Sequence, residues 1–202
     1  RVEDVIGGLL NKIVSGFSFP RTMAWNGSGL RFPRPIRWLC CLYGSQALPV
    51  ELAGLTASEV TYGHRHVSAG ALTCSSVSEY FDRLREHKVL VDEDERRKSI
   101  LSQLRLKAEE HGVDPSCFNP ALIEDIARLT EFPFAVSGHF REEYLELPAD
   151  VLATCMKKHQ KIFACYTRER TLVNTFIAFL DGERKRTEAI RAGYENVLES
   201  RL

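Results

Sequence analysis

Several features that would assign a function directly are missing from this 202-residue sequence. No apolar run reaches the roughly 18 residues that a membrane-spanning helix needs, and no signal-peptide pattern is present at the start. The 27 basic and 27 acidic residues cancel, so the chain as a whole is not a cationic clamp for nucleic acid. Neither common glycine-rich phosphate motif occurs, which removes the usual sequence sign of a nucleotide site.

Cysteine pairs with the spacing of metal ligands are also absent. The six cysteines include no C-x-x-C pair, so the sequence does not support a structural zinc site, and we predict no metal. Four of the six lie inside apolar runs, namely Cys40, Cys41, Cys155 and Cys165. We therefore expect free thiols in a reducing compartment rather than disulfides. Because the first residue is Arg1 rather than Met, we expect an internal piece of a longer chain.

The sequence does contain strand-like segments on both sides of a helical middle. The apolar run 36–43 predicts a buried strand with 48–52 as its neighbour, and 162–167 and 172–180 predict a hairpin. This order predicts an α+β fold with a mixed, largely antiparallel sheet and a helical insertion at about 75–130. The expected domains are a helix or linker at 1–20, a core at 21–182, and the start of a helical region at 183–202.

Local signals mark the ends of several helices. Asp92 begins an acidic run that suits a helix start, Gly112 suits the end of that helix, and Asn119-Pro120 suits the start of the next. Near the N-terminus, apolar residues recur at helical spacing over 3–14. Gly7 and Gly8 interrupt that pattern, and they either weaken the helix or mark close packing.

A cluster of lysines ends another predicted helix, which opens at Leu147-Pro148 and runs to about Gln160. We expect its inward face to hold Val151, Leu152, Cys155 and Met156. Lys157, Lys158 and Lys161 would then project together from the other side. Three cations on one face can neutralise RNA phosphates, and the alternative is a solvated helix end whose lysines complement the helix dipole.

A second basic group consists of Arg31, Arg34 and Arg37, with aromatic residues interleaved. Arginine beside aromatic rings suits RNA backbone and stacked bases, so Arg34 and Arg37 are further candidate RNA contacts. Packing of the arginine stems with hydrogen bonds to loop carbonyls is an equally good interpretation.

Histidines and a cysteine offer weaker candidates for chemistry. His64 and His66 would share one face of a strand, but no third ligand is clustered with them, so we expect them to position a loop. Cys155 and His159 would be neighbours on a helix. Cys155 follows the apolar spacing, however, and we expect it to pack in the core; no catalytic residue is predicted.

Five dispersed segments resemble, in order, the beta subunit of bacterial-type glycyl-tRNA synthetase. They are F-P-R-P-I-R-W-L at 32–39, T-Y-G-H-R at 61–65, L-E-L-P at 145–148, M-K-K-H-Q-K at 156–161 and the stretch 193–202. The resemblance marks six motif residues, to which we assign structural roles: Gly63, His64, Arg65, Pro148, His159 and Gln160. Ile162 and Ala164 depart from the family pattern, which suggests a divergent member, either one with fused alpha and beta regions or an organellar one.

The resemblance implies a parent enzyme that joins glycine to tRNA(Gly) with ATP and Mg²⁺, in the cytoplasm or in an organelle. Its alpha subunit, or the alpha region of a fused chain, would hold the aminoacylation site. This piece should then carry no cofactor and act as a noncatalytic accessory domain through tRNA or subunit contacts. Two alternatives stay open: an editing-like hydrolase of mischarged tRNA with His64, His66 or His159 as base, and a purely architectural spacer.

Overall fold

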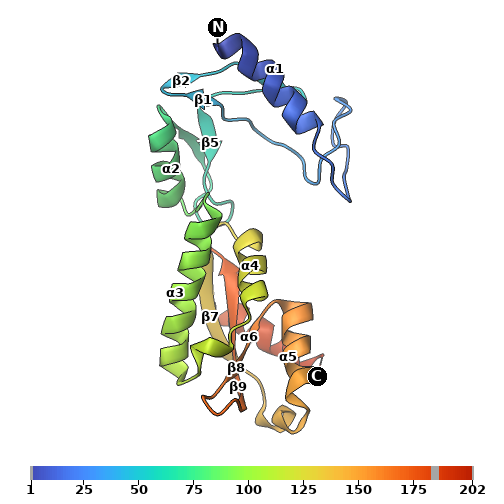
Figure 1. Ribbon diagram of the computed structural model, residues 1–202, viewed down its shortest axis with the longest axis vertical. Helices are drawn as coiled ribbons and strands as arrows, with labels where there is room; N and C mark the ends of the chain where they lie inside the picture. The colour runs from blue at the N-terminus through green and yellow to red at the C-terminus, as the bar shows by residue number, and fades with distance from the viewer. Residues whose placement is uncertain (1, 183–186, 202) are drawn as a thin grey trace. The chain divides into compact units, whose positions relative to one another are not determined.

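The computed structural model describes residues 2–182 and 187–201, which form two compact units, 1–87 and 88–202 (Figure 1). The boundary falls inside the segment that the sequence predicted as a helical insertion. Helices combine with small antiparallel sheets in the chain, so the predicted α+β class is confirmed. None of the described helices is long and apolar enough to span a membrane.

The first unit consists of two helices and three short hairpins. Helix α1 (Val2–Ser15) comes first, and α2 (Val77–Glu86) ends the unit. The hairpins pair β1 (Leu42–Tyr43) with β2 (Gln46–Ala47), β3 (Glu51–Leu52) with β4 (Leu55–Thr56), and β5 (Val60–Tyr62) with β6 (Ala71–Thr73). Their core is small: Leu48, Val50 and Ala57 are buried, and Ile6, Leu10, Leu39 and Cys41 pack against them.

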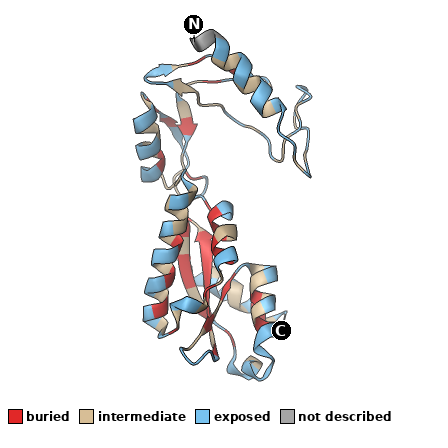
Figure 2. Ribbon diagram, in the orientation of Figure 1, coloured by how far each residue is buried: buried red, intermediate tan, exposed pale blue. Residues whose placement is uncertain are grey.

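The second unit is built on a three-stranded antiparallel sheet of order β7-β9-β8. Its strands are β7 (Pro133–His139), β8 (Phe163–Tyr166) and β9 (Leu172–Asp181). The predicted hairpin of the last two strands is confirmed. Because helices cover both faces, the central strand β9 is apolar at consecutive positions rather than at alternate ones. Figure 2 shows this strand as largely buried.

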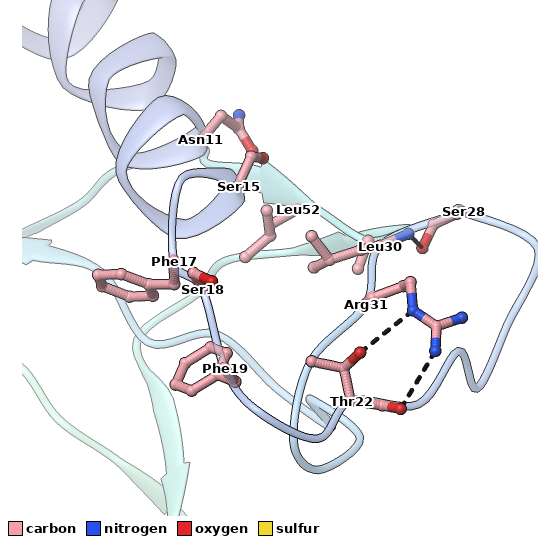
Figure 3. A pocket seen from close by; sticks show the side chains of 12 residues that line it. Asn11, Ser15, Phe17, Ser18, Phe19, Thr22, Ser28, Leu30, Arg31 and Leu52 are labelled. Carbon is pink, nitrogen blue, oxygen red and sulfur yellow. Dashed lines mark hydrogen bonds between the residues drawn. The ribbon is translucent and has the colours of Figure 1, made fainter.

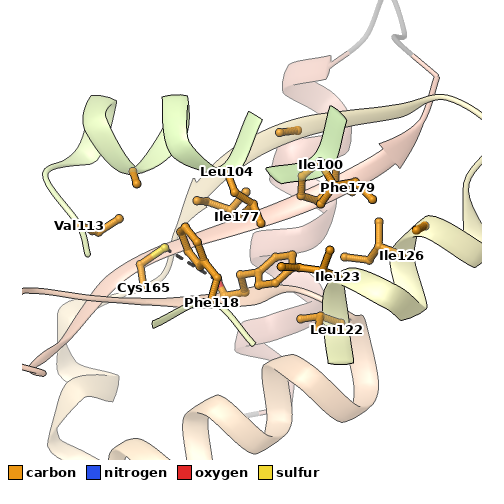
Figure 4. Close-up of a cluster of buried hydrophobic side chains, with 14 residues drawn as sticks. Ile100, Leu104, Val113, Phe118, Leu122, Ile123, Ile126, Cys165, Ile177 and Phe179 are labelled. Carbon is orange, nitrogen blue, oxygen red and sulfur yellow. Dashed lines mark hydrogen bonds between the residues drawn. The ribbon is translucent and has the colours of Figure 1, made fainter. Parts of the chain in front are cut away.

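Two hydrophobic clusters lie on the two faces of this sheet. On one face, α3 (Glu93–His111), η1 (Pro115–Cys117) and α4 (Pro120–Leu129) pack around Ile177 and Phe179 (Figure 4). On the other face, Phe176, Ala178 and Leu180 meet α5 (Ala149–Cys155), the π-helical turn η3 (Met156–Gln160) and α6 (Thr187–Glu199). The short η2 (Glu142–Glu146) precedes α5.

The predicted helix ends are confirmed where a local signal marks them. Asp92 caps α3 by accepting from the backbone N–H groups of Asp94 and Glu95, and Gly112 ends the helix at φ 65°. Asn119 caps α4 by accepting from the Leu122 N–H, and Pro120 follows it. Each cap satisfies backbone groups that have no partner within the helix.

The prediction of a buried strand at 36–43 is wrong. Only Leu42–Tyr43 is a strand there, and no residue of the run is buried. Trp38 is 43% exposed, and its ring centroid lies 4.7 Å from that of Tyr62. The expected neighbour is right only at its start: the Leu48 N–H donates to Cys41 O at 3.0 Å, whereas Glu51–Leu52 pairs with Leu55–Thr56 in a tight hairpin. An apolar run becomes a buried strand only when a partner strand and a covering layer exist.

Candidate RNA-contacting surface

The lysine cluster lies where α5 changes its helical geometry. Pro148 precedes the helix, and its carbonyl accepts from the Val151 and Leu152 N–H groups at 2.9 and 3.3 Å. The last turn, η3, is a π-helix, a form that often occurs at functional sites. Lys161 then adopts φ 55°, and Met156 O accepts from the N–H groups of Lys161 and Ile162. The αL conformation is costly for a residue with a Cβ, which marks this helix end as locally constrained.

The apolar side of this helix differs from the predicted one at a single position. Leu152 and Met156 are fully buried, and Cys155 packs partly buried against the same cluster. Val151, which we expected to point inward, is 55% exposed, so that part of the prediction is wrong. The inward arc is therefore narrower and is centred on Leu152 and Met156.

The three lysines do not have the same surroundings. Lys158 is exposed and Lys157 is half-buried, and neither takes part in a hydrogen bond or ion pair among the described residues. Lys161 is paired: its Nζ lies 2.6 Å from Oδ2 of Asp125 on α4. This hydrogen bond lowers the pKa of the Asp125 carboxyl, and the charge of Lys157 acts in the same direction. Lys157 and Lys158 are therefore the cations free to meet a phosphate, whereas Lys161 joins the helix end to α4.

The polar residues between the lysines differ in exposure. His159 is exposed on η3. Gln160 is half-buried, and both polar atoms of its amide are buried without a hydrogen-bond partner among the described residues. A buried amide without a partner costs free energy, so Gln160 is another constrained position at this helix end.

In the first unit, Arg34 and Arg37 lie exposed on the irregular segment before β1 and have no hydrogen bond or ion pair among the described residues. Arg31 behaves differently. Its Nε donates to Thr22 Oγ1 at 3.1 Å, and its Nη2 donates to the Thr22 carbonyl at 3.2 Å. The predicted alternative, a guanidinium bonded to a loop carbonyl, thus applies to Arg31. Arg34 and Arg37 have no such bond among the described residues and are available to a partner.

Arg31 also lines an open pocket of about 650 Å³ beside the end of α1 (Figure 3). Phe17 and Phe19, on the segment that leaves α1, lie near it, together with several side-chain hydroxyls. Arg31 is the one formal charge in the lining, so the pocket suits an anionic or aromatic group better than a cation. Phe17 and Phe19 were missed in the sequence, because isolated aromatic residues in a turn-rich segment carry no pattern.

The T-Y-G-H-R segment comprises the end of β5, Thr61 and Tyr62, and the start of the tight loop that follows it. His64 is 1% exposed. Its backbone N–H donates to the backbone carbonyl of His87 at 2.9 Å, and its ring Nδ1 accepts from the backbone N–H of His66 at 3.3 Å. A Cβ on Gly63 would lie 2.8 Å from His87 Cβ, so only glycine fits there. Arg65 is exposed. His64 therefore has the geometry of a residue that positions this loop.

The histidines that could serve as a hydrolytic base do not converge on the pocket at Arg31, whose lining includes none of His64, His66 and His159. The six cysteines are free thiols, as predicted. Burial raises the pKa of Cys165 to about 12, so that thiol does not ionise near neutral pH.

Comparisons with known proteins agree with the resemblance carried by the five motifs. The family model of the glycyl-tRNA synthetase beta subunit matches residues 1–202. The chain belongs to this family. The beta subunit of glycine–tRNA ligase from Moorella thermoacetica is 43% identical over 198 residues, which is 98% of this chain and 28% of that protein. The corresponding subunit from Syntrophomonas wolfei is 39% identical over 200 residues, covering 99% of this chain and 29% of the relative.

The chain thus spans between a quarter and a third of the length of these beta-subunit relatives. Its five motif segments lie in both compact units, so the family match does not depend on one of them.

Proposed function

We propose that residues 1–202 are a noncatalytic accessory region of a glycine–tRNA ligase and contact tRNA through the lysines at the end of the α5–η3 helix. The parent reaction would join glycine to tRNA(Gly) using ATP and Mg²⁺, with an alpha subunit or alpha region as partner. The family match supports this parent reaction. The observation that supports the contact is a constrained helix end that presents Lys157 and Lys158 without an ion partner among the described residues.

The release of counterions explains how a few lysines could support RNA binding in a chain of zero net charge. Each phosphate that a lysine neutralises releases counterions, so binding weakens with salt in proportion to the number of neutralised phosphates. Elsewhere in the second unit, three cations of α3 and α4 are held in ion pairs: Arg97, Lys107 and Arg128. Arg97, for example, binds Glu124 with its Nε 2.6 Å from Oε1. Two neighbouring lysines at a constrained helix end, rather than overall charge, would therefore determine where RNA binds.

The decisive experiment is a salt titration of tRNA(Gly) binding by the intact synthetase. A Lys157→Ala/Lys158→Ala double variant should lower the magnitude of the log K against log [salt] slope by roughly 0.7–0.9 for each phosphate that the two lysines neutralise. Lys98→Ala is the matched control, because Lys98 is an exposed lysine on α3, on the other face of the sheet. An unchanged slope in the double variant would contradict the tRNA contact and favour the spacer.

Asp125 separates the role of Lys161 from those of its neighbours. An Asp125→Asn substitution removes the carboxylate charge that holds Lys161. Because the charge of Lys157 also acts on Asp125, the substitution is made in a Lys157→Ala background. If Lys161 only braces the helix end, tRNA affinity should not change there; if it also meets phosphate, affinity should rise. The hydrolase alternative has its own assay, in which the synthetase is incubated with alanyl- or seryl-tRNA, and no deacylation above the buffer rate rules it out.

A further inference from the structure

Helix α1 carries a broad apolar arc, of which only one edge packs against the rest of the first unit. Ile6 and Leu10 pack against the small core of the first unit. Val5, Leu9 and Ile13 follow one another at intervals of four residues and so form a strip of the helix surface that adjoins the strip of Ile6 and Leu10. They are 66%, 52% and 45% exposed, and Phe17 just beyond the helix is 52% exposed. We call these four residues the outer face of α1.

Two glycines in the middle of the helix have no explanation within the described structure. Glycine makes a helix interior less stable than alanine does. A Cβ built on Gly7 or on Gly8 meets no atom within 4 Å, so no described neighbour requires glycine there. Gly63 and Gly138 differ, since a Cβ at either would collide with described atoms. Gly8 lies three residues after Val5 and so beside it on the helix surface, where a missing side chain lets another backbone approach closely.

The chemistry of the outer face suits a protein segment. Between residues 5 and 17 the sequence has one charged residue, Lys12, so the face offers little to RNA phosphates. A continuous exposed apolar surface normally marks a place where protein packs.

We infer that the outer face of α1 is the docking surface for another segment of the same beta-subunit polypeptide, outside residues 1–202. More than two-thirds of the length of the beta-subunit relatives lies outside the region matched here. A segment on the same chain is held at a high effective concentration, which favours it over a separate molecule with an equal surface. The segment would present apolar side chains to Val5, Leu9 and Ile13 and approach closest at Gly8. This inference depends on the family match and not on the proposed tRNA contact.

Photo-crosslinking in the full-length synthetase tests this inference. The crosslinker p-benzoylphenylalanine in place of Leu9 should join α1 to a peptide of the same beta polypeptide from outside residues 1–202, with a yield that does not depend on protein concentration. Mass spectrometry identifies the peptide, and p-benzoylphenylalanine in place of Tyr43, which is 55% exposed on the β1–β2 hairpin, is the control. A crosslink from position 9 to the alpha partner or to a second beta copy would overturn the inference. The absence of any crosslink to protein would overturn it as well.

A substitution at Gly8 gives an independent readout with opposite expected signs. In the 202-residue chain, Gly8→Leu should increase helicity by circular dichroism, because leucine is the better helix former and a Cβ at this position meets no described atom within 4 Å. In the full-length subunit the same leucine should separate α1 from its docked segment, and proteolysis within α1 should become several-fold faster. Equal protease resistance of the variant and the wild-type full-length subunits would overturn the inference.

Discussion

At the scale of single residues, Gly63 is the position where the family motif has the clearest physical reason. A Gly63→Ala substitution places a Cβ against the Ser68 carbonyl and 2.8 Å from His87 Cβ, so the loop after β5 must move. We expect a loss of about 1–3 kcal/mol in the free energy of unfolding, the usual cost of overpacking. Urea denaturation of the 202-residue chain measures it.

Gly70→Ala is the matched control, because a Cβ at Gly70 meets nothing within 4 Å. Both glycines flank the same loop, and neither has a positive φ. Equal stability changes for the two variants would show that close packing is not what the motif glycine provides.

Glu79 makes a prediction about pH. It accepts hydrogen bonds from Ser75 and Arg83, and these lower the pKa of its carboxyl from 4.5 to about 2. Because the folded-state pKa is lowered, the stabilisation is fully present above the unfolded-state pKa and is lost as the pH falls from about 4.5 toward 2. An NMR titration of the Glu79 carboxyl should therefore give a midpoint near 2, and Arg83→Ala should move this midpoint upward. A midpoint near 4.5 in the wild-type chain would contradict this arrangement of hydrogen bonds.

Single residues also show where reading the sequence succeeds. The capping residues Asp92, Gly112 and Asn119 were predicted correctly, because a cap depends on a few neighbouring residues. The exposure of Val151 was not predicted, since which arc of a helix is covered depends on elements far away in the sequence. For the same reason, the sequence placed Lys157, Lys158 and Lys161 together but could not show that Asp125 pairs with Lys161.

At the scale of secondary-structure elements, a glutamine from α3 braces the edge of the sheet. Gln103 Nε2 donates to Pro133 O at 2.8 Å, and Gln103 Oε1 accepts from the Ala135 N–H at 2.7 Å, so one amide satisfies two backbone groups of β7. Gln103→Ala leaves both groups without this partner. We expect the free energy of unfolding to fall by about 1–3 kcal/mol and hydrogen exchange at the Ala135 amide to become faster.

A second variant at this position distinguishes the hydrogen bonds from simple packing. Gln103→Glu keeps an acceptor for the Ala135 N–H and loses the donor to Pro133 O. Exchange at Ala135 should then stay slow while global stability falls. Fast exchange at Ala135 in Gln103→Glu would mean that the amide does not hold the strand as described.

Elements also show why part of the fold was predictable. The hairpin of β8 and β9 followed from two apolar runs joined by a short polar turn, which is a local signal. The run 36–43 has similar composition, but only Leu42–Tyr43 forms a strand there, and Leu39 and Cys41 are no more than partly buried against a small cluster. The π-helical turn η3 has no sequence signal of its own, because it depends on how Met156 and Ile162 are packed against the sheet.

At the scale of the whole molecule, the two compact units differ greatly in the size of their cores. The second unit buries clusters of fourteen and ten residues on the two faces of its sheet, whereas the cluster of the first unit has three buried residues, and Leu72, Cys74 and Leu84 are buried besides. A small core supplies little free energy against the conformational entropy of ordering a chain. We therefore expect residues 88–202 alone to unfold cooperatively in urea and to give a dispersed amide NMR spectrum.

Residues 1–87 alone should lack that cooperative transition, because their apolar surface is only partly buried and the outer face of α1 is uncovered. Within the full-length subunit, a segment docked on that face would enlarge the apolar area that stabilises this unit. Hydrogen exchange in α1 should accordingly be slower in the full-length subunit than in the 202-residue chain, while exchange in β9 is the same in both. Equal exchange of α1 in the two proteins would mean that the first unit gains its stability within residues 1–87, in spite of its small core.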